Sequence, residues 1–356
     1  MKTEFHQIHF IKKGKNMATK VLLSKDKKQF KANLHCHSTL SDGALTPEQL
    51  KEAYKAQGYS VLSITDHCVP CPHNDLTDDE FLMLTGYEAY IRPHPEGKYN
   101  QFKPEIHLNL FARDKNNDKF ICYNAPYAKY NKCDHATLNR VGSEEQREYT
   151  VEYINKFIAT AKEHGYILSY NHPYWSMEDE ERVFAYEGFF SLELDNTSSC
   201  TINSLEHAEM LYDKMLRRGM RIGCHSADDN HNKFDFSHPR CDSFGGHTMI
   251  LADSLDYDSV FSALENCDCY ASTGPRINEI SITDGQNVHV ECSDAERIIL
   301  FYGSKSSKVE VSLDGTPVNS ADLELHPKAK FFRITVIDKD GNKACSRGFF
   351  RDEFED

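Results

Sequence analysis

Hydrophobic and polar positions follow the same order in three separate segments of the chain. Residues 51–67, 157–172 and 210–225 each read as the end of a helix, a glycine, a short apolar run and then a histidine. A glycine directly after a helix supplies the left-handed residue that ends it, and a short apolar run between polar residues is typical of a buried strand. The repeat therefore predicts an α/β fold with parallel strands, whose functional side chains lie at the carboxyl ends of the strands.

The pattern elsewhere predicts the remaining elements of this α/β region. Further strands are expected at residues 31–34, 82–88, 105–111, 189–194 and 247–251, and a short helix at 256–265. The first helix should begin after Thr46, because threonine caps helices, Pro47 suits the first helical position and Gln49 occupies the capping-box position. Residues 113–143 have weak periodicity and many polar residues, which predicts a long loop or lid.

The sequence changes character after residues 272–275, which read Ser-Thr-Gly-Pro. Period-two strands are expected at 276–282, 288–292, 297–301, 308–312 and 330–337, separated by Asp-Gly turns. We therefore expect an N-terminal extension at residues 1–28, an α/β domain at 29–275 and a small all-β module at 276–356. The module contains no ligand-type cluster, which favours a structural role as a cap.

Charge and cysteine content restrict the partners and the compartment. The formal net charge of −14 argues against an extended nucleic-acid surface, and no apolar run approaches the length of a membrane span. The first 20 residues lack the apolar core of a signal peptide, so the 12 cysteines are expected to be reduced thiols of a cytoplasmic protein. Cys68 and Cys71 form a Cys-x-x-Cys pair, which leaves a redox pair or a soft metal site open.

Imidazole and carboxylate side chains gather where the predicted strands end. Residues two apart on extended chain point to the same side, so a pair such as His35 and His37 can hold one ion. A mixed set of this kind suits Zn²⁺, Mn²⁺ or Fe²⁺ better than Ca²⁺ or Mg²⁺, and its size favours two or three ions. The candidates are His35, His37, Asp42, Asp66, His67, Glu88, His107, His172, Asp229 and His231.

The order of these motifs resembles that of the PHP (polymerase and histidinol phosphatase) family. The motifs are His-x-His with Ser-Asp-Gly at 35–43, Thr-Asp-His at 65–67, the single Glu88 and His107, Asn-His-Pro at 171–173 and Asp-x-His at 229–231. The resemblance covers residues 30–275 and implies a distorted (β/α)7 TIM-like barrel, a two- or three-metal centre and phosphoesterase chemistry. Residues 245–275 resemble the stand-alone PHP metallohydrolases, a branch that includes proteins similar to carbaryl-type ester hydrolases.

The same resemblance implies a role for each candidate ligand. The first ion would be held by His35, His37, Glu88 and Asp229, and the second by Glu88, His107 and His172. A third would be held by His67 and His231, with help from Asp42 or Asp66.

Further residues are candidates for catalysis and for substrate binding. Asp66, His67 and Asp42 are the candidate catalytic groups, and Asp66 or a nearby histidine would protonate the leaving group. Arg276 and Arg113 are candidate phosphate contacts, and Tyr174, beside Trp175, could stack on a ring of the substrate.

The leading hypothesis is hydrolysis of a phosphate ester of a small anionic substrate, by in-line attack of a metal-bound hydroxide. The same centre would permit attack on a carbonyl carbon, so a carboxyl- or carbamate-ester hydrolase is the alternative. A third hypothesis is a non-catalytic scaffold module. The complete ligand set argues against it, because a scaffold does not need such a set. The sequence determines neither the substrate, nor the native metal, nor the oligomeric state.

Overall fold

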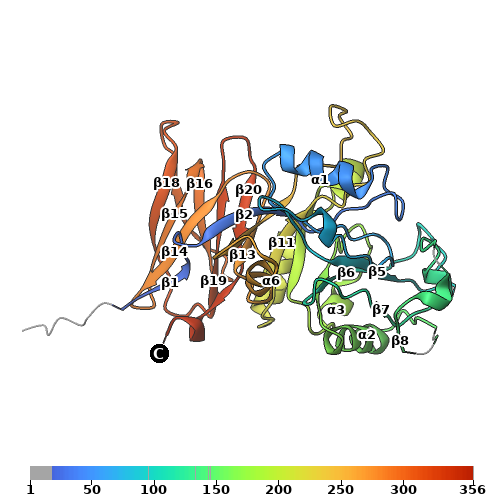
Figure 1. Ribbon diagram of the computed structural model, residues 1–356. Coiled ribbons are helices and arrows are strands. Elements are labelled where there is room, and N and C mark those ends of the chain that lie inside the picture. Colours follow the sequence, from blue (N-terminus) through green and yellow to red (C-terminus); the bar gives the residue numbers. More distant parts are fainter. Residues whose placement is uncertain (1–17, 95, 133, 143, 145, 356) are drawn as a thin grey trace, which may run out of the picture.

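The computed structural model describes residues 18–355 except 95, 133, 143 and 145. Helices and short strands make up one half of the molecule, and long antiparallel strands make up the other (Figure 1). The α/β architecture expected from the sequence is confirmed.

The three helix–glycine–strand repeats are present. Helices α1 (Pro47–Ala56), α2 (Val151–Glu163) and α5 (Glu209–Arg217) precede β3 (Val61–Leu62), β9 (Tyr166–Tyr170) and β11 (Gly223–Ala227), respectively. Each helix is followed by a glycine with positive φ, at Gly58, Gly165 and Gly219. Thr46 caps α1 in a capping box with Gln49, as expected. One face of α2, with Ile154, Phe157 and Ile158, is buried in the core of this half.

The strands of the α/β half lie in two sheets. In the first, β2 (Lys28–Asn33), β3 and β4 (Leu82–Met83) are parallel neighbours. The second has the order β11-β10-β9-β6-β5, where β5 is Gly86–Ile91, β6 is Ile106–Ala112 and β10 is Ser191–Asn196. Isolated parallel bridges join the two sheets at Cys36–Asn230 and His67–Glu88, beside the predicted ligands. Closure of these strands into a seven-stranded barrel stays a prediction.

Two strands of this half run antiparallel to their neighbours. Strand β6 is antiparallel to both β5 and β9, and β12 (His247–Ala252) is antiparallel to β2. His107 therefore reaches the site from the amino end of β6, whereas the sequence repeat predicted carboxyl ends throughout. The direction of β6 agrees with the absence of a helix among the described residues between β5 and β6, because parallel neighbours usually need a helical crossover.

The predicted C-terminal strands are confirmed, with three more among them. They are β14 (Ile277–Thr283), β15 (Asn287–Ala295), β16 (Arg297–Phe301), β17 (Lys308–Val311), β18 (Val318–Glu324), β19 (Phe331–Ile337), β20 (Lys343–Ser346) and β21 (Phe349–Phe350). One sheet has the order β1-β14-β15-β18, and the other passes from β20 through β13 (Cys269–Ser272) and β12 into β2. The β-rich region thus shares a continuous sheet with the α/β half.

Strand β1 (Thr19–Leu23) lies in the stretch to which the sequence assigned no element. It pairs antiparallel with β14, and its Leu23 is buried in the core of the β-rich half. A strand this short forms because it pairs with a strand far along the chain. Its own pattern of polar and apolar residues does not predict that pairing. Residues 1–17 of the expected N-terminal extension lie outside the described residues.

The expected loop at 113–143 is a compact insertion with two short strands, β7 (Phe120–Ile121) and β8 (Arg140–Val141). Arg147, just beyond it, is 1% exposed and donates a hydrogen bond of 2.8 Å to the carbonyl of Tyr90 in β5. Its guanidinium also lies 4.4 Å from the ring centroid of Tyr127. These contacts hold the insertion against the strand that carries Glu88. The sequence positions 133 and 143 of the insertion lie outside the described residues.

The remaining helices are α3 (Glu180–Val183), α4 (Thr197–Asn203) and α6 (Tyr257–Glu265), the last of which was expected from the sequence. Within the described residues, no helix has both the length and the apolar character needed to cross a membrane.

Candidate metal centre

The carboxylate of Glu88 is the centre of a buried cluster of histidines. Glu88 lies in β5 and is 0% exposed. Five imidazole nitrogens lie within 3.5 Å of its oxygens: those of His35, His37, His67, His107 and His172, at 3.2, 3.5, 2.6, 2.9 and 3.4 Å, respectively. A single carboxylate in contact with so many imidazoles can bridge several ions.

Asp229 closes one side of this cluster. Its Oδ1 lies 2.9 Å from Nε2 of His37 and 3.2 Å from Nε2 of His35. Its backbone has a φ of 53°, and its N–H donates to the carbonyl of His35 at 2.8 Å. A left-handed aspartate is conformationally costly, and such residues concentrate at functional sites. His35, His37 and Asp229 form one group that could hold an ion.

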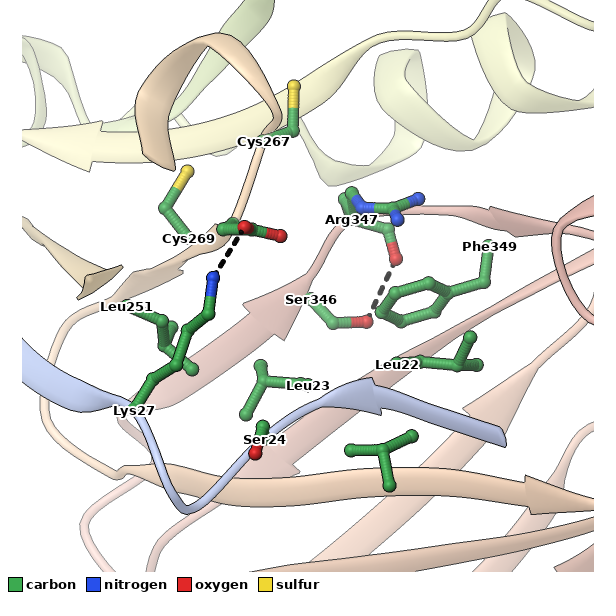
Figure 2. Close-up of a pocket in the computed structure, with 12 residues that line it drawn as sticks. Leu22, Leu23, Ser24, Lys27, Leu251, Cys267, Cys269, Ser346, Arg347 and Phe349 are labelled. Atoms are coloured by element: carbon green, nitrogen blue, oxygen red, sulfur yellow. Dashed lines mark hydrogen bonds and ion pairs between the residues drawn. The ribbon is translucent and has the colours of Figure 1, made fainter. Parts of the chain in front are cut away.

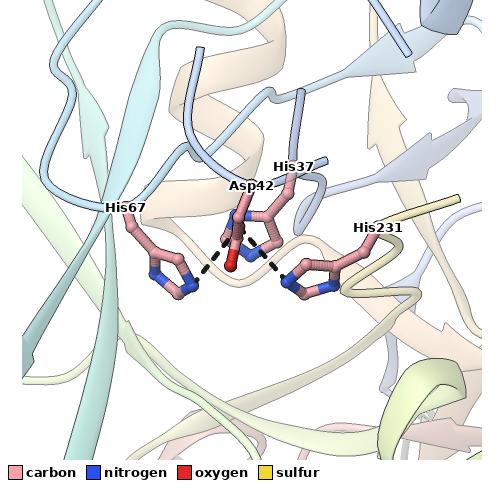
Figure 3. A group of neighbouring side chains, drawn as sticks. All are labelled: His37, Asp42, His67 and His231. Atoms are coloured by element: carbon pink, nitrogen blue, oxygen red, sulfur yellow. Dashed lines mark ion pairs between the residues drawn. The ribbon is translucent and has the colours of Figure 1, made fainter. Parts of the chain in front are cut away.

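A second side of the cluster is formed by His37, Asp42, His67 and His231 (Figure 3). Oδ1 of Asp42 lies 3.5 Å from Nε2 of His231, 3.8 Å from Nε2 of His67 and 4.0 Å from Nδ1 of His37. These distances are too long for hydrogen bonds. The same distances are close to the separation between two ligand atoms on a tetrahedral ion, which is about 3.4 Å when the metal–ligand bonds are about 2.1 Å long. The site for a third ion expected at His67 and His231 thus includes Asp42 and a nitrogen of His37.

The outward ring nitrogen of four histidines has a fixed partner. A fixed partner of this kind sets the tautomer and leaves the other nitrogen free to bind a metal. Nδ1 of His35 lies 3.0 Å from Glu193, Nε2 of His107 3.2 Å from Glu105, Nδ1 of His172 3.1 Å from Ser176 and Nδ1 of His231 2.9 Å from the carbonyl of Asp229.

Glu193 was missed in the sequence analysis, although the strand that carries it was expected. Its side chain is 0% exposed, its Oε2 accepts the N–H of His172 at 2.9 Å, and it forms a ligand-type group with His35 and His172. The available signal was a carboxylate inside the apolar run of β10, where a buried charge needs a partner. Glu105 was also missed; its Oε1 lies beside His107 and its Oε2 pairs with Arg92.

Electrostatics keep the central carboxylates ionised. Burial opposes ionisation of Glu88, but His107, His35 and His67 hold its pKa well below the usual value. Burial likewise disfavours the charged imidazole of His35, but the carboxylates of Asp229, Glu88 and Glu193 raise its pKa well above the usual value. The cluster is therefore a set of anionic and imidazole donors in a dry environment.

Unpaired buried atoms indicate that this donor set fits divalent cations. Within the described part of the chain, Nδ1 of His37, Nδ1 of His67 and Oε2 of Glu88 are buried without a hydrogen-bond partner. The last two lie only 2.6 Å apart, but not in hydrogen-bond geometry. Buried polar atoms are almost always paired, and divalent transition ions would satisfy all three. The borderline-hard donors suit such ions.

Residues 33–190 match the model of the PHP domain. This stretch, which is less than half of the chain, is therefore similar to PHP domains. The matched stretch includes Glu88 and six of the predicted ligands, whereas Glu193, Asp229 and His231 lie beyond it and reach the same cluster from later strands.

The similarities to individual proteins are either short or low in sequence identity. A 5′-3′ exoribonuclease of Haemophilus influenzae is 54% identical over 37 residues, and the match spans 10% of this chain and 14% of that protein's length. A two-domain protein of Bacteroides vulgatus, which contains a predicted PHP-like metal-dependent phosphoesterase, is 15% identical; the match covers 92% of this chain and 97% of that one, with a TM-score of 0.45. A candidate metal-dependent phosphoesterase of Bifidobacterium adolescentis is 16% identical; the match covers 65% of this chain and 95% of that one, with a TM-score of 0.40.

Asp66, within the matched stretch, faces away from the ligand atoms. Its carboxylate accepts hydrogen bonds from the N–H of Ser38 at 2.8 Å, from the hydroxyl of Ser38 and from the hydroxyl of Ser41. It belongs to none of the ligand-type groups found among the described residues. Gly43 closes the same loop, because a Cβ there would lie 2.2 Å from the carbonyl oxygen of His37. Asp66 is thus placed to shape the loop that presents Asp42.

Two arginines expected to contact the substrate lie at the far ends of their segments. The chain reverses at Gly274, and Arg276 Nη2 then donates to Gln29 at 3.3 Å. Gln29 precedes His35 by six residues of extended chain, roughly 20 Å. Arg113 follows the carboxyl end of β6, at a similar distance from His107, and pairs with Glu265. Arg276 was expected at the edge of the site because it follows Gly274 and Pro275, but neither guanidinium lies among the ligand groups of the described residues.

Replacing Arg276 or Arg113 by alanine should therefore leave KM for a phosphoester and the metal content within about twofold of the wild type, since neither guanidinium reaches the cluster. Steady-state kinetics and metal analysis of both variants would check this. A KM raised tenfold in either variant would restore the original assignment.

Aromatic side chains line the cluster, but the rings next to its histidines belong to Trp175 and Tyr130 rather than to Tyr174. Tyr174 is half-buried and packs against the main core. The ring of Trp175 lies 5.0 Å from that of His172 and 5.4 Å from that of His107, centroid to centroid. The ring of Tyr130, in the insertion, stacks on His67 with a centroid distance of 5.7 Å. Burial and the carboxylate of Asp42 raise the pKa of Tyr130 to about 12.

A separate cavity of about 200 Å³ lies where β1 meets β12 and the segment after β20 (Figure 2). Apolar side chains such as Leu22, Leu23 and Phe349 line it together with polar ones, among them the ion pair of Lys27 and Asp268. None of the candidate ligands lines it. It thus lies apart from the ligand groups found among the described residues.

Proposed function

We propose that this protein is a metal-dependent phosphoesterase that acts on a small anionic substrate. The observation that carries the proposal is the position of Glu88, whose two oxygens contact five imidazoles and connect ligand groups on both sides. Two or three divalent ions, Zn²⁺, Mn²⁺ or Fe²⁺, fit this donor set. When bound, such ions lower the pKa of a coordinated water and neutralise charge on phosphoryl oxygens.

Different residues of the chain would hold the ions on the two sides of the centre and orient their ligands. His35, His37 and Asp229 would hold one side of the centre, with Glu193 and Ser176 orienting His35 and His172 through their outward nitrogens. His67 and His231 would hold the other side. Asp42, the more exposed carboxylate of the cluster, would complete that side as a ligand, whereas Asp66 would hold the loop that presents it.

The division of the chain is part of the proposal. We assign the chemistry to residues 29–275, arranged as a distorted barrel, and a structural role to residues 276–356. All four ligand-type groups within the described residues come from positions between 35 and 231, which supports this division.

Metal analysis followed by a substrate panel tests the function. The purified protein should carry two to three transition-metal ions per chain, and it should hydrolyse phosphomonoesters or phosphodiesters faster than carboxyl esters. The short similarity to an exoribonuclease makes phosphodiesters and nucleoside bisphosphates essential members of the panel. Less than half an equivalent of metal after reconstitution would refute a catalytic centre. Carboxyl esters turned over far faster than any phosphoester would establish the carboxyl- or carbamate-ester alternative.

A further inference from the structure

Trp175 is partly open to solvent, whereas the metal ligands beside it are buried. His172 is 2% exposed and His107 is 3% exposed. The ring centroid of Trp175 lies 5.0 Å from that of His172 and 5.4 Å from that of His107, yet its side chain is only half-buried. The indole is therefore an aromatic surface that a molecule approaching these two ligands would meet.

The loop that carries Trp175 is fixed by a buried carboxylate. Glu206, which follows α4, is 0% exposed; its Oε2 accepts the N–H of Trp175 at 2.8 Å and its Oε1 accepts the N–H of Tyr174 at 3.5 Å. In the same loop the hydroxyl of Ser176 lies 3.1 Å from Nδ1 of His172. Because these contacts hold the loop in place before a substrate arrives, binding to the indole costs little conformational entropy.

An indole recognises a different part of a substrate from the part that metal ions recognise. Ions hold the charged phosphoryl oxygens, whereas the large apolar face of an indole favours contact with another planar ring. The organic part of a phosphate ester is joined to phosphorus through a single oxygen. It therefore lies close to the ions, within reach of a ring that packs on their ligands.

Tyr130, the other aromatic ring beside the histidines, is already engaged. It stacks on His67 with a centroid distance of 5.7 Å and an interplanar angle of 26°, and Nζ of Lys129 lies 4.7 Å from its centroid. Of the two rings, Trp175 is thus the better placed to contact a substrate.

We propose that Trp175 selects phosphate esters whose organic part carries a planar aromatic ring, and that Glu206 is a positioning residue that holds the indole beside the metal centre. The inference rests on the proposed phosphoesterase function and deepens it, because it names a substrate class for the same site.

Titration calorimetry of the metal-loaded protein with three phosphonates tests the selection. Methylphosphonate, cyclohexylphosphonate and phenylphosphonate share the anionic group and have no ester bond to hydrolyse. Phenylphosphonate should bind about five- to tenfold more tightly than methylphosphonate and about threefold more tightly than cyclohexylphosphonate, because only phenylphosphonate offers a planar ring. Trp175 is the only tryptophan in the chain. Its fluorescence emission should shift to shorter wavelength with phenylphosphonate and stay unchanged with methylphosphonate.

Variants identify the groups responsible, with methylphosphonate as the reference for an intact metal centre. Trp175→Leu should reduce the preference for phenylphosphonate over methylphosphonate to less than twofold, and Trp175→Phe should keep at least about threefold. Glu206→Ala should lose most of the preference, because the loop loses its acceptor, whereas Glu206→Gln keeps an acceptor oxygen and should restore it. Met177→Ala is the matched control: Met177 is apolar, 53% exposed and in the same loop, and its loss should leave the preference unchanged.

The outcomes separate this inference from the proposed function. If the wild type binds methylphosphonate and phenylphosphonate equally well, ring selection is wrong while the phosphoesterase stands. A loss of preference in Met177→Ala as large as in Trp175→Leu, or equal binding of the cyclohexyl and phenyl compounds, would show that general apolar contact is responsible and would refute selection by the indole. An unchanged preference in Glu206→Ala would refute the positioning role. If the metal-loaded wild type binds none of the phosphonates and hydrolyses no phosphoester, both proposals fall.

Discussion

Replacing Glu88 by alanine should remove most of the bound metal and lower phosphoester hydrolysis by roughly a thousandfold or more. Glu88 is the carboxylate shared by His35, His67, His107 and their neighbours, so its loss affects both sides of the centre at once. It would also leave several buried imidazoles without their central anion, which weakens every remaining metal position.

Metal content per chain and single-substrate kinetics measure the effect. Glu88→Gln keeps the shape of the side chain and removes its charge, so it should lose metal nearly as completely. Glu178→Gln is the matched control, because Glu178 is also a buried glutamate but lies outside the ligand groups. Burial raises the pKa of Glu178 to about 7, so a neutral glutamine resembles its protonated form. A Glu88→Ala protein with full metal content would show that Glu88 does not bridge the ions.

The sequence predicted those ligands of the site that belong to short, local motifs. His35 and His37, or Asp229 and His231, lie two residues apart directly after a strand, and strand ends gather at one edge of a sheet. The structure brings all of the expected ligands except Asp66 into the ligand groups, although their assignment to individual ions stays a prediction.

The part that the sequence did not predict depends on strand direction and on distant partners. Arg113 follows a strand whose antiparallel direction puts its far end away from the site. Glu193 lies inside an apolar strand, and its buried charge is explained by contacts with His35 and with the N–H of His172. Tyr130 stacks on His67 through the packing of an insertion with no periodicity of its own. In each case the decisive contact is made by residues far apart in the sequence.

Replacing either of the neighbouring residues Asp228 and Asp229 should destabilise the protein, but only the replacement of Asp229 should remove metal. Asp229 faces the histidines, but the Asp228 carboxylate is 0% exposed and accepts four hydrogen bonds. The donors are the hydroxyls of Tyr54 and Thr197, both at 2.7 Å, and the N–H groups of Phe244 and Gly245, at 2.8 and 3.0 Å. Asp228 thus ties α1, α4 and the loop before β12 together beneath the metal centre.

Asp228→Ala should therefore lower the free energy of unfolding by about 3–5 kcal/mol, because the N–H groups of Phe244 and Gly245 and the hydroxyl of Thr197 lose their acceptor at about 1–3 kcal/mol each, partly relieved by entering water. The hydroxyl of Tyr54 keeps Asn230 as an acceptor. Denaturant unfolding of metal-free protein measures this without the contribution of bound ions. In the same assay Asp229→Ala should also be less stable than the wild type, since buried His35 and His37 lose their carboxylate partner, and in addition it should lose metal. Asp228→Asn keeps one acceptor oxygen and should be intermediate. Equal unfolding free energies for Asp228→Ala and the wild type would mean that the four hydrogen bonds do not hold these loops in place.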